Sequence, residues 1–177
     1  RIYFDICSEI TSEVQSDKIS FGITRNSVYC GKGDTDVLKH GGDATMIEWG
    51  NVHLAMSDAV CGAAKQSERC GHFHFKTELP EITEDCAINE DYPFLYGIRE
   101  YSGADRISGF FCLAYDDIYS IEYFHEPLKP YWKRNGDGIE DAIDKAIAEY
   151  EDVNARCDKF DAELIDAAQK ISPKYAD

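Results

Sequence analysis

Hydrophobic and polar residues alternate along much of the first 125 residues, with the period of two that β-strands show. Ile2, Phe4 and Ile6 begin this pattern, and turn-forming Gly and Asp residues separate the later runs. We expect strands over residues 2–7, 19–23, 28–30, 46–56, 73–75, 94–101 and 109–124. Short strands divided by such turns predict a mainly β fold, an antiparallel β-sandwich. Gly50, inside one of the longer runs, predicts a bulge.

Beyond Pro127 and Pro130 the period changes to that of an α-helix. Apolar residues recur in steps of three and four at Ile139, Ile143, Ile147, Tyr150, Val153, Cys157, Phe160, Leu164, Ala168 and Ile171. Asp137 and Glu140 have the spacing of a capping box. One helix over 138–171 would be roughly 50 Å long, too long for the small domain before it. We therefore expect a sandwich domain over 1–135 and a long helix over 136–177 that leads toward a downstream helical domain.

The negative net charge of the chain argues against some classes of binding partner. The 177 residues carry a formal net charge of −16, and such a surface repels phosphate backbones and anionic lipids. We therefore expect no nucleic-acid partner. No run of 18 apolar residues occurs, so we expect no membrane span. Residues 78–91 hold six carboxylates and no base, and predict a solvated loop or edge.

The cysteines bear on the compartment. Their odd number and irregular spacing argue against a disulfide framework and favour reduced thiols. They are Cys7, Cys30, Cys61, Cys70, Cys86, Cys112 and Cys157. Reduced thiols favour the cytoplasm, while a secreted or periplasmic location stays open because the sequence starts at Arg1 inside a strand pattern, with no signal peptide in view.

One group of residues could hold a metal ion. Cys70, His72 and His74 lie close together, with Cys61 nine residues earlier, and two His residues at a spacing of two share a strand face. No CxxC or HExxH motif accompanies them. A surface-facing pair on a half-buried strand explains the same residues, and we prefer that interpretation. We therefore assign no metal site and no cofactor.

Two further groups of residues have side chains suited to catalysis or ligand binding. Asp116, Asp117 and Glu122 lie among aromatic residues, as glycosidase carboxylates do, but adjacent residues on a strand point to opposite faces. We expect turn or ion-pair roles for them. Trp49 and Trp132 could stack on a ligand or pack between domains, and a strand Trp is more often part of a core. No Gly-rich phosphate loop fits, since Gly31-Lys32-Gly33 lacks its context, and no GxSxG elbow occurs, so we assign no catalytic residue.

A family resemblance emerges from several segments. Trp-Gly-Asn-Val-His-Leu-Ala at 49–55 resembles the "WGxVYYA" strand of the N-terminal domain of the glutaminase A family, a domain of unknown function. Residues 4–9 resemble its "DxSAEW" segment, and 106–123 its "FxIGHVRDPAIxY" strand. Residues 130–136, 139–142 and 157–164 resemble the segment that enters the family's next domain. The His and Arg of "GHVRD" are missing, because this chain has Ala-Tyr-Asp-Asp at 114–117.

The resemblance implies a β-sandwich before a helical (α/α) toroid domain that is the home of catalysis. The family takes its name from fungal enzymes that hydrolyse L-glutamine, and many bacterial relatives have no assigned substrate. We therefore expect a non-catalytic accessory domain of a hydrolase, with glutamine or a sugar bound mainly elsewhere and the helical domain of the same polypeptide as its partner. The alternatives are a carbohydrate-binding or glycoside-hydrolase-associated sandwich module, and a metal-dependent protein that uses the Cys and His residues named above.

Overall fold

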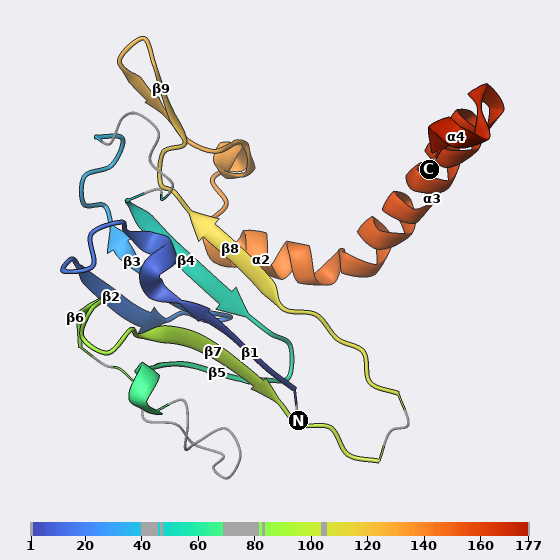
Figure 1. The fold of residues 1–177 in the computed structure, drawn as a ribbon. Helices are drawn as coiled ribbons and strands as arrows, with labels where there is room; N and C mark the ends of the chain where they lie inside the picture. The colour runs from blue at the N-terminus through green and yellow to red at the C-terminus, as the bar shows by residue number, and fades with distance from the viewer. Residues whose placement is uncertain are drawn as a thin grey trace. The chain divides into compact units, whose positions relative to one another are not determined.

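The computed structural model describes residues 2–39, 46, 48–68, 82, 84–103 and 106–176. The chain divides into two compact units, residues 1–143 and residues 144–177. The first unit holds the strands and the second holds most of the long C-terminal helix (Figure 1). The expected boundary after residue 135 stays a prediction.

The strands of the first unit form antiparallel sheets, as the alternating pattern predicts. One sheet has the order β1 (Ile2–Cys7), β7 (Phe94–Arg99), β5 (Val60–Ala64). The larger sheet has the order β6 (Cys86–Ala87), β2 (Lys18–Ile23), β3 (Val28–Gly33), β4 (Gly50–Ala55), β8 (Cys112–Asp116). Figure 1 shows β3, β4 and β8 side by side. The expected strand-rich, antiparallel fold with a long C-terminal helix is confirmed.

The hydrophobic core draws on both sheets. Ile19 of β2 and Leu54 of β4 are fully buried together with Leu95 of β7. Phe4 and Ile6 of β1 pack against the same cluster from the smaller sheet. Alternate residues of β1 to β5 pack in this core, which explains why the period of two is visible in their sequences.

The predicted bulge lies on the strand opposite Gly50 and not at Gly50 itself. Gly31 pairs with Asn51 and Gly33 pairs with Gly50, so Lys32 is an extra residue on β3. Gly50 opens β4 with a φ of +77°, and a Cβ there would lie 2.0 Å from the carbonyl oxygen of Asp116. The close approach of β8 therefore requires glycine at this position.

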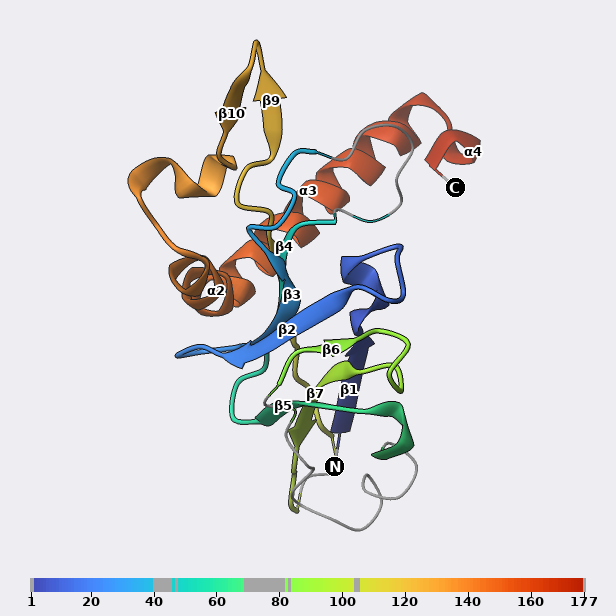
Figure 2. The ribbon, with the colours of Figure 1, turned by 90° about the vertical axis from the view of Figure 1, so that its left-hand side faces the viewer.

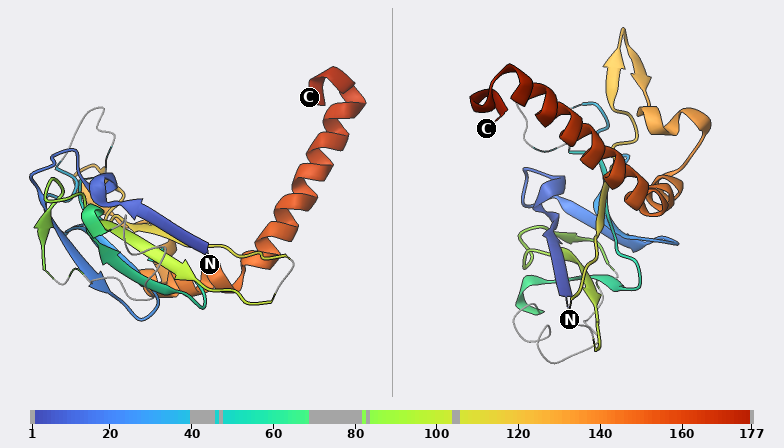
Figure 3. Two further views of the ribbon diagram at one scale, coloured as in Figure 1. Left: turned by 60° about the horizontal axis from the view of Figure 1, so that its bottom comes forward. Right: turned by 90° about the vertical axis from the view of Figure 1, so that its right-hand side faces the viewer.

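The expected strand over 109–124 is wrong, because the chain turns in its middle. After β8 it turns at Ile118, which has a φ of +61°, and it then forms a separate hairpin of β9 (Ile121–Tyr123) and β10 (Glu126–Leu128). The hairpin projects away from the two sheets (Figure 2; Figure 3, right). A short 3₁₀ helix, η2 (Tyr131–Asn135), follows it, and another, η1 (Ser8–Thr11), follows β1.

The helical region begins one residue later than expected and is interrupted twice, at Glu149 and at Ser172. It consists of α2 (Ile139–Ala148), α3 (Tyr150–Ile171) and α4 (Pro173–Ala176). The carboxylate of Asp141 accepts a hydrogen bond from the Gly138 amide at 3.0 Å, so the N-terminal cap involves this pair and not Asp137 with Glu140. None of the helices in the described ranges has the length and apolar content that a membrane span requires.

Candidate functional site

A cluster of charged side chains lies inside the first unit, which we call the Lys32 cluster. The Lys32 ammonium lies 2.7 Å from a carboxylate oxygen of Asp17 and 2.9 Å from one of Glu48. The Ser12 hydroxyl lies 2.9 Å from each of these carboxylates, and the Glu13 amide donates to Glu48 at 2.5 Å. Glu48 is only 4% exposed. The bulge on β3 allows Lys32 to leave the sheet pattern and reach this cluster.

The electrostatics of the Lys32 cluster keep all three of its ionisable groups charged. The hydrogen bond from Lys32 lowers the pKa of Asp17. Burial works to raise the pKa of Glu48, but the Glu13 amide and Lys32 together lower it. Burial likewise opposes the charge of Lys32, yet its bonds to the two carboxylates raise its pKa. A lysine with a raised pKa is a poor general base. The cluster instead links the segment after η1, strand β3 and the start of β4 by ion pairs and hydrogen bonds.

A second polar group joins a serine of the β2–β3 turn and a histidine of β4. The Ser27 hydroxyl lies 3.0 Å from Nδ1 of His53, and Thr24 lies 2.8 Å from the same hydroxyl. Burial lowers the pKa of His53, so the ring is neutral, although Asp116 and Glu140 partly oppose this effect. Ser27 and His53 are 6% and 3% exposed. A pair so deeply buried offers a substrate no access, and its role is to hold the β2–β3 turn on β4.

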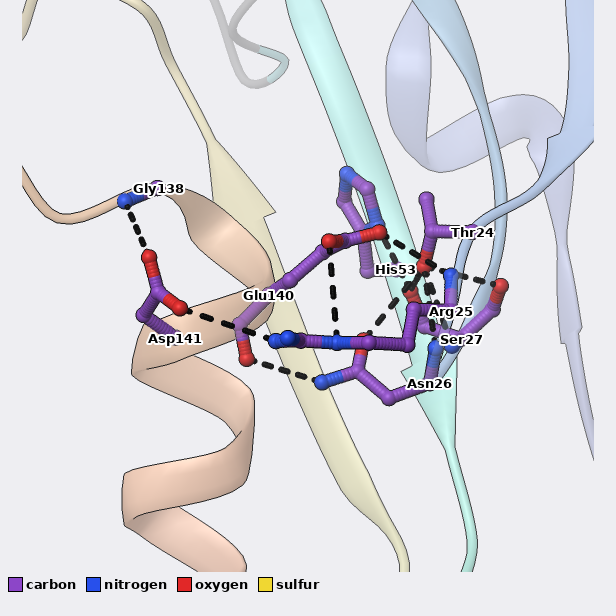
Figure 4. Close-up of polar contacts among 8 residues, drawn as sticks. All are labelled: Thr24, Arg25, Asn26, Ser27, His53, Gly138, Glu140 and Asp141. Carbon is purple, nitrogen blue, oxygen red and sulfur yellow. Dashed lines mark hydrogen bonds and ion pairs between the residues drawn. The ribbon is translucent and has the colours of Figure 1, made fainter.

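The same turn fixes the start of α2. The Arg25 amide donates to the Glu140 carboxylate at 2.9 Å, and the Asn26 side chain donates to the Glu140 carbonyl at 2.8 Å (Figure 4). The Arg25 guanidinium also lies 3.8 Å from Glu140 and 3.6 Å from Asp141. Ile143 of α2 is 1% exposed. These contacts secure the first turns of α2 to the sandwich.

The two tryptophans predicted as stacking or interdomain residues are both half-buried. Trp49 donates its indole N–H to the carbonyl of Asp117 at 2.7 Å, and Tyr115 donates to the Trp49 carbonyl at 2.7 Å. The Lys133 ammonium lies 4.8 Å from the centre of the Trp132 ring. Trp49 thus links β4 to the turn after β8, which is a packing role. A ligand-stacking or interdomain role for either tryptophan stays a prediction.

The carboxylates of Asp116, Asp117 and Glu122 do not form an acid–base pair. Asp116 forms an ion pair with Lys133 of η2 and also accepts a hydrogen bond from the Ile118 amide at 2.9 Å. Asp117 follows the strand and contributes its carbonyl to Trp49. Glu122 is on the hairpin, 3.3 Å from the ring of His125. These are turn and ion-pair roles.

The metal hypothesis falls mainly outside the described residues. Cys70, His72 and His74 lie outside them, whereas Cys61 is a half-buried thiol on β5 whose pKa is raised by burial. Within the described ranges no three His, Cys, Asp or Glu side chains gather as a metal site would require. All the described cysteines are free thiols.

Among the described residues, exposed apolar side chains form one notable surface in each unit. The first, the hairpin surface, consists of Ile121, Tyr123, Phe124, Leu128 and Tyr131. The second, the α3 stripe, consists of Val153, Cys157, Phe160, Leu164 and Ile171, and no residue of α3 is buried. A shallow hollow on α3 is lined by Val153, Arg156, Cys157, Phe160 and Asp161. Large exposed apolar patches mark interaction sites, so these two surfaces are the candidate functional surfaces of the chain.

Sequence reasoning missed the Lys32 cluster, the Ser27–His53 pair and the hairpin surface. The two ends of the Ser12–Glu48 contact are 36 residues apart, and no local pattern reports such a distance. The extra residue between Gly31 and Gly33 was a usable signal, because a charged residue between two glycines within a strand is typical of a bulge.

Comparison with protein families assigns the chain. The model of a family described as a domain of unknown function, DUF5127, matches residues 1–167. The chain belongs to the DUF5127 family. The match covers both units of this DUF5127 chain, including most of α3, and its description names no activity. Among the curated proteins and the solved structures, none matches the chain significantly.

Proposed function

We propose that this DUF5127 chain is a non-catalytic β-sandwich domain of a glutaminase A-like hydrolase, and that it packs on a downstream helical toroid domain. The observation that carries this proposal is the exposed α3 stripe. Phe160 is 63% exposed, Leu164 57% and Ile171 75%, although their spacing is that of a buried helix face. We infer that the apolar face of α3 is covered by a partner surface outside this chain.

The spacing and charge of α3 describe its partner. Apolar residues at steps of three and four pack best against another α-helix, whose ridges fit the grooves between them. The stripe is flanked by more carboxylates than cations, with Asp152, Asp158 and Asp161 among the former. A helix with an apolar face and Lys or Arg at its edges is the complementary surface.

The polar groups of the first unit support a non-catalytic role. The ionisable residues of the Lys32 cluster are engaged with one another, and Ser27 and His53 are buried. The resemblance to the glutaminase A family, described above from segments 49–55 and 157–164, supports the identity of the parent enzyme.

The proposal is tested by ammonia release from L-glutamine. We expect no turnover by the 177-residue chain and turnover by a polypeptide that also carries the downstream helical domain. In the longer protein, Phe160→Asp should lower the melting temperature or the activity, whereas Asp158→Asn on the same helix should not. Turnover by the chain alone, or a longer protein indifferent to Phe160→Asp, would overturn the proposal.

A second candidate is a carbohydrate-binding module, favoured by the exposed rings of the hairpin surface. Phe124 is 82% exposed and Tyr131 78%, and exposed aromatic rings stack on sugars. The Arg134 guanidinium already covers one face of Tyr131, at 3.8 Å from the ring centre. Calorimetric titration of the chain with a glycan series decides this case: binding that is lost in Phe124→Ala supports it, and no heat with any glycan removes it.

A further inference from the structure

His53 lies on the outer face of the larger sheet, away from the hydrophobic core. Tyr29 of β3 pairs with His53, and His53 pairs with Ala114 of β8, so these three residues form a row across the sheet. Val52 and Leu54, on either side of His53, belong to the core. Because successive residues of a strand point to opposite faces, the His53 ring points to the other face. The Tyr29 and His53 ring centres are 5.2 Å apart there.

The start of α2 lies over this outer face. It lies on one side of β3 and β4, and β1 lies on the other side (Figure 1; Figure 2). His53 is only 3% exposed although it faces away from the core, and Ile143 of α2 is 1% exposed. The Glu140 carboxylate on the first turn of α2 is close enough to act on the charge of the His53 ring. The start of α2 is therefore part of what encloses this ring.

The β2–β3 turn contacts both the His53 ring and the helix. The Ser27 hydroxyl lies 3.0 Å from Nδ1 of His53. The two preceding residues donate hydrogen bonds to Glu140 of α2, Arg25 from its amide and Asn26 from its side chain (Figure 4). Because three consecutive residues make all of these bonds, a movement of Ser27 changes the contacts that hold the start of α2.

Charged groups act on the ring from two other elements. Asp116 of β8 and Glu140 of α2 both favour the charged imidazolium. Each carboxylate is itself paired, Asp116 with Lys133 of η2 and Glu140 with the guanidinium of the β2–β3 turn. β3 contributes the tyrosine ring described above. Burial outweighs the two carboxylates, so the pKa of His53 lies below its ordinary value. The imidazolium is thus more stable in water than in its enclosed position.

We propose that His53 is a pH-sensitive contact, which holds the start of α2 on the sheet at neutral pH and releases it in acid. In a neutral ring Nδ1 can accept the hydrogen of the Ser27 hydroxyl, whereas a protonated Nδ1 can only donate. The new charge becomes hydrated when α2 leaves the sheet. Departure of Glu140 opposes the release by removing an attractive charge, but burial is the larger effect. The contact lies within the first unit, so this inference does not depend on the proposed function.

Amide hydrogen exchange of the 177-residue chain, measured at pH 7 and pH 5.5 and corrected for intrinsic exchange rates, tests the release. We expect the protection of residues 142–148 to fall by up to about eightfold, because protonation shifts such an equilibrium at most about tenfold per pH unit below about 6.5. Release exposes little surface, so this exchange should barely change at low urea concentrations, whereas exchange of β4 through global unfolding should accelerate. Protection of residues 142–148 that is independent of pH, or that follows β4 in its response to urea, overturns the inference.

The variant His53→Gln removes the titrating ring but keeps a side chain that can form a hydrogen bond with Ser27. Its protection of residues 142–148 should be the same at both pH values. The matched control is His125→Gln, because the His125 side chain is 98% exposed, and this variant should keep the full pH dependence of the unaltered chain. An unchanged fall in His53→Gln, or loss of the fall in His125→Gln, would assign the effect to another group and overturn the inference.

Nuclear magnetic resonance of the His53 ring protons is a second measurement, and it needs no variant. The ring should titrate with a midpoint below its ordinary value of about 6.5. The amide signals of residues 142–148 should move toward those of a released segment with the same midpoint, because one equilibrium governs both. Different midpoints would show that protonation of the ring and release of α2 are separate events, and the inference would then be wrong.

Discussion

The sandwich and α3 differ in the burial of their apolar and charged residues. In the first unit Ile19, Leu54 and Leu95 are fully buried, and even the charges of Lys32 and Glu48 are enclosed and paired. In α3 nothing is buried, and its ion pairs, such as Arg156 with Asp152, are exposed. Both regions have regular hydrophobic periods. A period therefore states which face a segment will bury, whereas only tertiary structure shows whether the partner lies within the same chain.

This contrast assigns stability and association to different regions. The first unit pairs the charges of the Lys32 cluster within itself, so changes inside it should alter the free energy of unfolding of the chain. The stripe on α3 is exposed in this chain, so under the proposed function changes there should act on association. Four measurements test this division, taken in order of decreasing expected effect.

The largest effect is expected at Gly50. A Cβ would lie 2.0 Å from the Asp116 carbonyl oxygen and would also occupy a φ of +77°, so Gly50→Ala should cost about 4 kcal/mol of unfolding free energy. Gly33→Ala is the control, because Gly33 has a φ of +58° with no atom within 4 Å of its Cβ position. It should cost about 1 kcal/mol. Urea denaturation measures both, and equal costs would contradict the role of the β8 approach.

A somewhat smaller effect is expected from the Lys32 cluster. Lys32→Met leaves two largely buried carboxylates without their cation, and should cost about 3 kcal/mol. The matched control is Lys39→Met, whose side chain is 74% exposed and pairs with Asp36 at 3.1 Å. That change should cost less than about 0.5 kcal/mol. If urea unfolding shows a similar loss of unfolding free energy for both variants, the Lys32 cluster does not stabilise the first unit.

A third effect concerns pH and His53. Burial lowers the pKa of His53 in the folded state, whereas in the unfolded state the ring titrates near its ordinary value, about 6.5. Protonation therefore favours the unfolded chain, and stability should fall as the pH drops below about 6.5, by at most about 1.4 kcal/mol per unit. Urea titrations between pH 7 and pH 5 measure this slope, and His53→Gln should remove it. An unchanged slope in that variant would assign the effect to other groups.

The smallest effect is expected on α3. Leu164→Gln in the 177-residue chain should change the unfolding free energy by less than about 0.5 kcal/mol, because the side chain is already 57% exposed. Leu54→Ala, at a fully buried position, provides the comparison and should cost about 3 kcal/mol. Thermal unfolding followed by circular dichroism measures both. A large loss in Leu164→Gln would mean that the stripe is buried in this chain after all.

The strands were predictable where one face meets the core. Ile19 and Phe21 alternate with outward residues on β2, so the period of two was visible, and the steps of three and four on α3 were equally clear. The β9–β10 hairpin was not predicted, because left-handed positions in its turns are occupied by residues that rarely adopt positive φ. Ile118 and Phe124 both have positive φ without being Gly, Asn or Asp, so these residues themselves give no turn signal, although Asp116 and Asp117 before Ile118 do.

The polar clusters escaped prediction for a different reason. Ser27 reaches His53 across 26 residues, and Arg25 reaches Glu140 across 115. Contacts of this kind depend on the order of strands in the sheet, which the local pattern does not encode. The apolar stripe of α3 was predictable from its spacing, and its exposure agrees with a helix too long for its domain; the external partner stays a prediction.

The contact between Arg25 and Glu140 also has a consequence for the order in which the chain folds. It closes a loop of 115 residues, and loops of that length are costly in entropy until the segments between them are already ordered. During synthesis, which proceeds from the N-terminus, the β2–β3 turn leaves the ribosome long before α2 exists. The hydrogen bonds from the Arg25 amide and the Asn26 side chain to Glu140 therefore form late, and we expect docking of α2 to be a late step in the folding of the first unit.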